Sequence, residues 1–246
     1  MFPFVTRTDN PIVGACKWDL DMPNCGTCGY CYAQGEKGIK HNRPVLKKLY
    51  TGEPRLNPNV LRKRLKSGDF LFPSMRDWYS LGVTEELRSK AFSWIRECSN
   101  VATARGGEPI TVLILTKNPR GAYTDLTKDL IPRNCIIGAT IEADINYTNL
   151  SGAPPQSERI EFMISIKSDF PEYKTFVCAE PILQHNEDFA ELLAPIRPWA
   201  FAVGYDNHKH RMLEPALAIT KKLVDDLSWT APVYLKKLRK AWWEEE

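Results

Sequence analysis

The chain has 246 residues and a formal net charge of +3, with 43% hydrophobic and 26% charged residues. These values are typical of a globular protein, and the charge is far below that of dedicated nucleic-acid binders. No run of about 18 apolar residues is present, so no membrane span is expected. The N-terminus lacks a signal-peptide pattern and no linker is evident, so we expect one cytoplasmic domain over residues 1–246.

Short apolar runs alternate with helical patterns along the chain. Residues 45–49 predict a short strand or a turn, and Asn57 and Pro58 are a plausible N-cap and first residue of a helix over 57–66. Apolar runs predict strands over residues 69–73, 111–115, 135–142, 175–179, 199–204 and 232–235. Helices are predicted over residues 84–104, in the polar segment that follows Pro119, and over 157–168, 188–193 and 215–227.

This alternation of strands and helices predicts an α/β fold. Strands that are continuous apolar runs are typical of a parallel sheet covered on both faces. A polar or ionisable residue follows several of the strands: Asp77, Lys117, Glu142, Glu180 and Asp206. Ligand sites of such folds form at the C-terminal ends of the strands, so we expect these residues to line a common site. Taken singly, each of them could instead be an exposed charge.

Four of the seven cysteines lie within sixteen residues, in a loop over about residues 10–34: Cys16, Cys25, Cys28 and Cys31. An odd number of cysteines without an export signal argues against a disulfide framework and fits metal-bound thiolates in a reducing cytoplasm. The remaining cysteines lie beside apolar residues and are expected to be buried: Cys98, Cys135 and Cys178.

Thiolates at this density fit three kinds of chemistry. Four thiolates would suit a structural zinc site. A dithiol redox motif would use only the Cys28–Cys31 pair and leave the other cysteines without a role. An iron–sulfur cluster can be held by three thiolates, which leaves one iron open.

The loop resembles the cluster loop of the radical S-adenosylmethionine (radical SAM) superfamily, in which three cysteines hold a [4Fe–4S] cluster. Tyr30 stands where that superfamily has an aromatic residue before the last cysteine, but the usual spacing of the first two cysteines is absent. The loop is more similar to that of the phage-associated three-cysteine radical SAM-like proteins, whose motif runs roughly Asn-Pro-x-x-Gly-Cys, a spacer and Cys-x-x-Cys-Tyr-Ala. The matching segments are Asn10-Pro11-Ile12-Val13-Gly14-Ala15-Cys16 and Cys28-Gly29-Tyr30-Cys31-Tyr32-Ala33. The departures are the extra Ala15 and a longer spacer that contains Cys25.

The resemblance continues in order along most of the chain. The matching blocks are Ser74-Met75-Arg76-Asp77, Leu115-Thr116-Lys117-Asn118-Pro119, Ile137-Gly138-Ala139-Thr140-Ile141-Glu142, Ala179-Glu180-Pro181 and Pro232-Val233-Tyr234-Leu235-Lys236. Together they imply a partial (β/α)6 TIM-like barrel of radical SAM type, with the cluster at its open top.

The resemblance also implies the cofactors and their ligands. Cys16, Cys28 and Cys31 would bind three irons of a [4Fe–4S] cluster, with Cys25 as the alternative first ligand. The fourth iron would bind S-adenosylmethionine, which the cluster cleaves reductively to a 5′-deoxyadenosyl radical that abstracts hydrogen from an unidentified substrate. An electron donor such as flavodoxin or ferredoxin would be the partner, and nucleic-acid modification or repair is one candidate reaction.

Individual roles follow from the same resemblance. Tyr30 would lie against the adenine, and Ser74 and Asp77 would accept from the ammonium group of S-adenosylmethionine. Lys117 is a candidate for its carboxylate and Glu142 for its ribose hydroxyls. Two candidates for catalysis, nearer the substrate, are Glu180 and Asp206. The alternative from another class is a non-catalytic zinc-binding α/β module, which could bind nucleic acid.

Three further groups of basic or histidine residues have expectations that come from residue type and position alone. Arg62, Lys63, Arg64 and Lys66 are expected to form the solvated face of the predicted helix over 57–66 rather than a nucleic-acid patch. Residues 236–243, which are basic with aromatic neighbours, fit a nucleic-acid contact and an anchored cationic face equally well. His208 and His210 are expected to be solvated rather than to form a second metal site.

Overall fold

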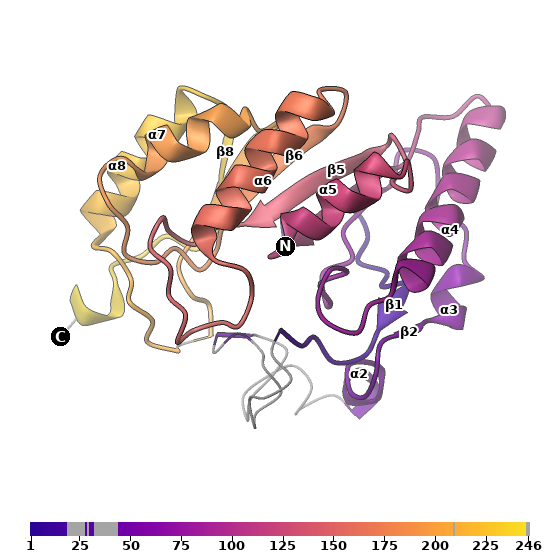
Figure 1. Cartoon of the computed structure of the whole chain (residues 1–246), viewed down its shortest axis with the longest axis horizontal. Coiled ribbons are helices and arrows are strands. Elements are labelled where there is room, and N and C mark those ends of the chain that lie inside the picture. The colour runs from indigo at the N-terminus through magenta and orange to yellow at the C-terminus, as the bar shows by residue number, and fades with distance from the viewer. Residues whose placement is uncertain (19–27, 29, 32–43, 209, 245–246) are drawn as a thin grey trace.

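The structure, a computed structural model, describes residues 1–18, 28, 30–31, 44–208 and 210–244 (Figure 1). Six parallel strands form a curled half-barrel sheet in the order of the sequence. Their bounds are β3 (Phe70–Leu71), β4 (Thr111–Thr116), β5 (Cys135–Thr140), β6 (Lys174–Ala179), β7 (Ala200–Val203) and β8 (Val233–Leu235). The prediction of a mixed α/β fold with a partial-barrel parallel sheet is therefore confirmed at this level.

Helices follow the strands and pack over one face of the sheet (Figure 1). Their bounds are α4 (Glu85–Ala104), α5 (Pro119–Thr127), α6 (Gln156–Asp169), α7 (Phe189–Leu193) and α8 (Leu217–Ser228), and the short helix η1 (Ala194–Ile196) follows α7. The predicted cap of α4 is present, since the Thr84 side chain accepts from the backbone N–H of Leu87. Within the described residues, no helix is both long enough and apolar enough to cross a membrane.

The structure corrects the prediction for three short segments. A helix, α2 (Pro44–Leu49), replaces the predicted strand or turn, because proline is favoured in a first helical turn. The predicted helix over 57–66 is only α3 (Pro58–Leu61), since the chain turns to bury Leu65. Sequence analysis missed the antiparallel pair β1 (Ile12–Val13) and β2 (Arg55–Leu56), which precede the barrel, and the final turn η2 (Trp242–Glu244).

The N-terminal segment fills the inner face of the half-barrel. Phe4 contacts Phe70 of β3 and Tyr234 of β8, with ring centroids 4.8 and 4.9 Å apart, and these strands are the two edges of the sheet. Phe2 packs against Phe176 of β6 at 5.2 Å. The aromatic rings thus close the open side of the sheet, and the interior above them remains as a cavity.

Candidate functional site

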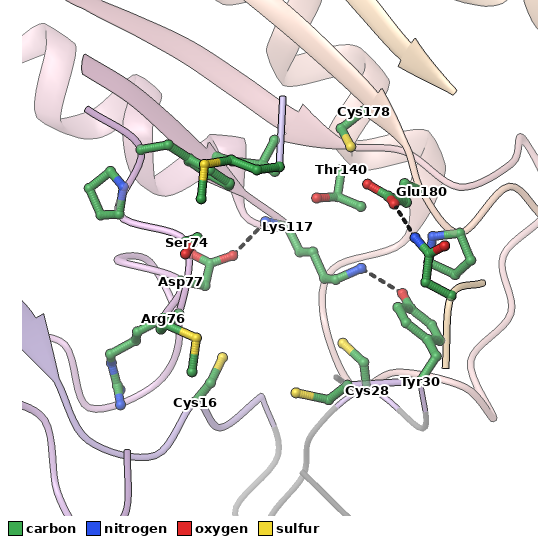
Figure 2. A pocket seen from close by; sticks show the side chains of 18 of the residues that line it. Cys16, Cys28, Tyr30, Ser74, Arg76, Asp77, Lys117, Thr140, Cys178 and Glu180 are labelled. Atoms are coloured by element: carbon green, nitrogen blue, oxygen red, sulfur yellow. Dashed lines mark hydrogen bonds between the residues drawn. The ribbon is translucent and has the colours of Figure 1, made fainter. Parts of the chain in front are cut away.

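A cavity of about 510 Å³ opens at the C-terminal ends of the parallel strands (Figure 2). The predicted site residues on its lining are Cys16, Cys28, Tyr30, Cys31, Ser74, Asp77, Lys117, Glu180 and Asp206. Glu142 does not line the cavity but bonds to Lys117 and Tyr30, which do. Cys25 lies outside the described residues. Parallel strands present their carboxyl ends at one edge, and this explains why residues so far apart in sequence meet here.

Asp77 fixes the segment after β3 to the end of β4. One of its oxygens accepts from the Thr116 hydroxyl and the backbone N–H of Tyr79, at 2.7 and 2.9 Å. The other oxygen accepts from the backbone N–H of Lys117 at 2.7 Å. Burial raises the pKa of Asp77 above its usual range, although these hydrogen bonds oppose the shift. Asp77 therefore connects the segment after β3 to the end of β4, in addition to any contact it makes with a ligand.

The cysteines share one end of the cavity. Figure 2 shows the side chains of Cys16 and Cys28 on either side of a gap at this end, and Cys31 belongs to the same lining. The Cys28 sulfur lies 3.1 Å from the Ser151 hydroxyl, in the loop that leads to α6. The backbone N–H of Cys31 donates to the carbonyl of Cys28 at 2.9 Å, which forms a tight turn between them. The described part of the loop thus brings three cysteines to the lining of one cavity.

Polar contacts surround the Cys16 sulfur. Burial, followed by the charges of Asp77 and Cys28, raises the pKa of Cys16 to about 12. Hydrogen-bond contacts of the sulfur with the Ser80 hydroxyl and the backbone of Asp77 oppose that shift. Such contacts to sulfur are among those that tune protein-bound iron–sulfur clusters.

Arg76 holds the backbone next to Cys16. The guanidinium is 3% exposed and donates to the carbonyl of Ala15, to Leu81 O at 3.3 Å and to the Ser80 hydroxyl at 3.3 Å. Among the described residues it makes no ion pair with a carboxylate, and its Nε has no hydrogen-bond partner. A buried cation usually needs a compensating anion, so a negatively charged group beside Cys16 would stabilise this arrangement.

Lys117 and Tyr30 form one contact between the cysteine loop and the sheet. The Lys117 ammonium donates to the Tyr30 hydroxyl at 2.5 Å and also to Glu142, and it lies 4.6 Å from the centre of the Tyr30 ring. An ammonium group has three N–H donors, and these contacts use two of them. Lys117 is 14% exposed toward the cavity, so a third donor can reach a bound carboxylate.

Glu142 lies behind this pair and is completely buried. One oxygen accepts from Lys117 and Tyr30, and the other accepts from Arg159 at 2.8 Å and Gln156 at 2.7 Å, both on α6. Burial alone would raise its pKa, but Lys117 and Arg159 lower the pKa of Glu142 to about 2. Both oxygens are therefore engaged, and the predicted contact with ribose hydroxyls would require one of these bonds to break.

Glu180 follows β6 and lies away from Cys16 and Cys28 in the view of Figure 2. Its carboxylate accepts from the Asn207 amide at 2.9 Å and lies 3.7 Å from the Lys236 ammonium. Burial raises the pKa of Glu180 above its usual range, and Lys236 opposes the shift. A carboxyl, an amide and an ammonium group thus form a second polar wall, opposite the cysteine end.

Asp206 organises the loop that follows β7. It accepts from the backbone N–H groups of His208 and His210, at 2.9 and 2.5 Å, and from the His210 imidazole at 2.9 Å. Burial would raise its pKa, but these hydrogen bonds keep the pKa of Asp206 below its usual range. The carboxylate is therefore occupied by its own loop, and its predicted catalytic role stays a prediction.

Several residues of the site were not predicted from the sequence. Arg159, Gln156 and Ser151 are separated from their partners in the chain and belong to no recognisable motif. Lys236 was part of a matching block and of the basic segment 236–243, but its place in the cavity beside Glu180 was not predicted. Arg76 lies inside the block Ser74-Met75-Arg76-Asp77 at a variable position, so the pattern gave no signal for it.

Among the described residues, no three histidine, cysteine or carboxylate side chains lie close enough together to hold a metal ion. The cysteines share one end of the cavity without forming a closed ligand set there. Their donor chemistry fits an iron–sulfur cluster, because thiolates are its ligands and a buried guanidinium lies beside one of them. A scan against models of known protein families and a search of curated proteins gave no match to this chain.

Proposed function

We propose that the chain is a radical SAM enzyme that acts on an unidentified substrate. The observation that carries the proposal is the common cavity: three thiols line one end of it, and the strand ends of a parallel half-barrel line the rest. Bound at the cysteines, a [4Fe–4S] cluster would supply the electron that cleaves S-adenosylmethionine and so generates a hydrogen-abstracting radical. Cys16, Cys28 and Cys31 would be its ligands.

The residues of the cavity have separate tasks in this proposal. Lys117 would bind the carboxylate of S-adenosylmethionine with its remaining N–H donor, and Ser74 and Asp77 would accept from the ammonium group. Tyr30 would contact the adenine, in a position held by Lys117 and Glu142. Because Glu142 already accepts four hydrogen bonds, we assign it to positioning these two residues rather than to direct contact with the ligand.

The polar wall around Glu180 would face the substrate. Burial raises the pKa of Glu180, and its carboxyl would hydrogen-bond a polar group of the substrate. Lys236 and Asn207 would orient the substrate beside it. The aromatic rings of Phe2 and Phe72, which line the cavity, would exclude water from the reacting groups.

Metal analysis after anaerobic purification and reconstitution with iron and sulfide tests the cofactor part of the proposal. We expect about four irons per chain and broad absorption in the visible range, because the thiols would hold one [4Fe–4S] cluster. A colourless protein that retains one tightly bound zinc per chain would contradict the proposal and support a zinc-binding module instead.

A further inference from the structure

A second cavity, of about 490 Å³, lies away from Cys16, Cys28 and Cys31, at the end of the sheet where β3 and β4 begin. One of its walls is the turn over residues 62–67, which precedes β3, and the other is the C-terminal half of α4. We call it the basic groove. The basic residues on its lining are Arg62, Lys63, Arg64, Lys66 and Arg105, and Glu97 is the only acidic one among the described lining residues.

Two carboxylates close to the groove, Asp9 and Asp69, are already engaged. Asp9 pairs with Lys63 at 2.8 Å and with Arg7. Asp69 pairs with Arg7 at 3.2 Å and accepts from the backbone N–H of Lys66 at 2.7 Å. Within the described part of the chain, four groove cations consequently make no ion pair: Arg62, Arg64, the Lys66 ammonium and Arg105. The described groove lining therefore carries four cations without an ion pair against a single carboxylate, Glu97, and has an excess of positive charge.

The turn that carries three of these cations, Arg62, Arg64 and Lys66, is fixed to the rest of the protein. The carbonyl of Lys63 accepts from the Trp94 indole at 3.0 Å, and the Ser67 hydroxyl donates to the carbonyl of Glu108 at 3.2 Å. Leu65, at 6% exposure, anchors the middle of the turn in the core. The like charges are thus held around a concave surface rather than spread along a solvated helix face. Such an arrangement favours the binding of an anion.

We propose that the basic groove binds a nucleic-acid strand through its phosphates. Three of the four cations without an ion pair are arginines, whose planar guanidinium groups match phosphate oxygens bidentately. The surface is concave, so it fits a nucleic-acid strand better than it fits a flat membrane. Trp94 is 6% exposed and its N–H is used, so the ring offers no face for base stacking. Binding should therefore depend on salt and not on sequence.

The groove does not depend on the proposed radical chemistry. It lies where β3 and β4 begin, whereas the cysteine cavity lies where the strands end. A strand bound in the groove would leave the cavity open. The groove would serve as a docking site that holds a nucleic-acid strand on the protein, independently of the reaction at the cavity.

Fluorescence anisotropy with a labelled 20-nucleotide single-stranded DNA, titrated with the full chain over a series of salt concentrations, tests this proposal. The test variant combines R62Q, R64Q and R105Q. We expect its affinity to fall on the order of tenfold to a hundredfold, and the slope of log affinity against log salt to become shallower by about two. The single variant R105Q should shift in the same direction by a smaller amount.

A matched control removes the same charge elsewhere. R120Q, K128Q and R133Q replace three exposed cations that pair with Glu158, Glu85 and Glu172, and should change affinity by less than about twofold. Thermal unfolding of both triple variants should match that of the wild type, since all six residues are exposed.

Three outcomes would overturn the proposal. One is an equal loss of affinity in the two triple variants, which would indicate a response to net charge alone. Another is wild-type binding that does not depend on salt. The third is binding to vesicles of anionic phospholipid without binding to the oligonucleotide, which would identify the groove as a membrane-facing surface.

Discussion

Replacement of Cys28 or Cys31 by alanine is expected to reduce reconstituted iron to background, because in the proposed site each would supply one of the three thiolates. C98A should keep the full iron content, since Cys98 is a buried residue of α4 that lines the basic groove and not the cysteine cavity. Iron and sulfide analysis of each variant after anaerobic reconstitution measures the effect. Full iron in C28A or C31A would contradict the assignment.

The same series distinguishes the two candidates for the first ligand. We expect C16A to lose the cluster and C25A to keep it, because Arg76, Ser80 and the backbone of Asp77 all hold the region of Cys16 at the cavity. The reverse result, with cluster retained in C16A and lost in C25A, would show that the first ligand is Cys25. R76M should lower iron content about tenfold without abolishing it, as loss of a supporting contact around a metal ligand usually does.

Substitution E142Q is expected to lower the free energy of unfolding by about 3–5 kcal/mol. The carboxylate neutralises Arg159, which is 3% exposed, and Lys117, which is 14% exposed, and its loss would leave both cations buried without a counter-charge. Chemical denaturation measures the change. The control E158Q lies on α6, next to Arg159, where Glu158 makes a long 4.0 Å pair with the exposed Arg120, and should cost less than about 0.5 kcal/mol.

The pH dependence of the wild type gives a second measurement of the same interaction. The pKa of Glu142 is about 2 in the folded chain, against an ordinary value of 4.5. Its contribution is therefore fully present above pH 4.5 and is lost as the pH falls toward 2. E142Q should lack this part of the acid-induced loss of stability. An E142Q variant with the stability and acid profile of the wild type would exclude the proposed role of Glu142.

The strand positions could be predicted because a buried parallel strand is a continuous apolar run, and six such runs follow one another here. The site residues at the strand ends followed from the same topology. The roles of Glu142 and Asp77 could not be predicted, because their partners lie on other elements: Arg159 is on α6 and Thr116 ends β4. Only tertiary packing brings these groups together.

Short elements were predicted least well. β1 and β2 have only two residues each, which is too few to show a hydrophobic period in the sequence. The two strands pair with each other although they lie about forty residues apart in the chain. The four cations of the 62–66 segment indicated a helix face, whereas the burial of Leu65 ends the helix and turns them toward α4. The basic groove arises from that turn and was therefore not visible in the sequence.

The most direct test of the proposed enzyme is the cleavage of S-adenosylmethionine. Reconstituted protein should form 5′-deoxyadenosine when it is incubated anaerobically with S-adenosylmethionine and dithionite, and chromatography detects the product. The K117A variant should form it at least about tenfold more slowly, because Lys117 would bind the carboxylate of S-adenosylmethionine. The C28A variant should form none. A wild-type protein with a full complement of iron that yields no 5′-deoxyadenosine would contradict the proposed activity.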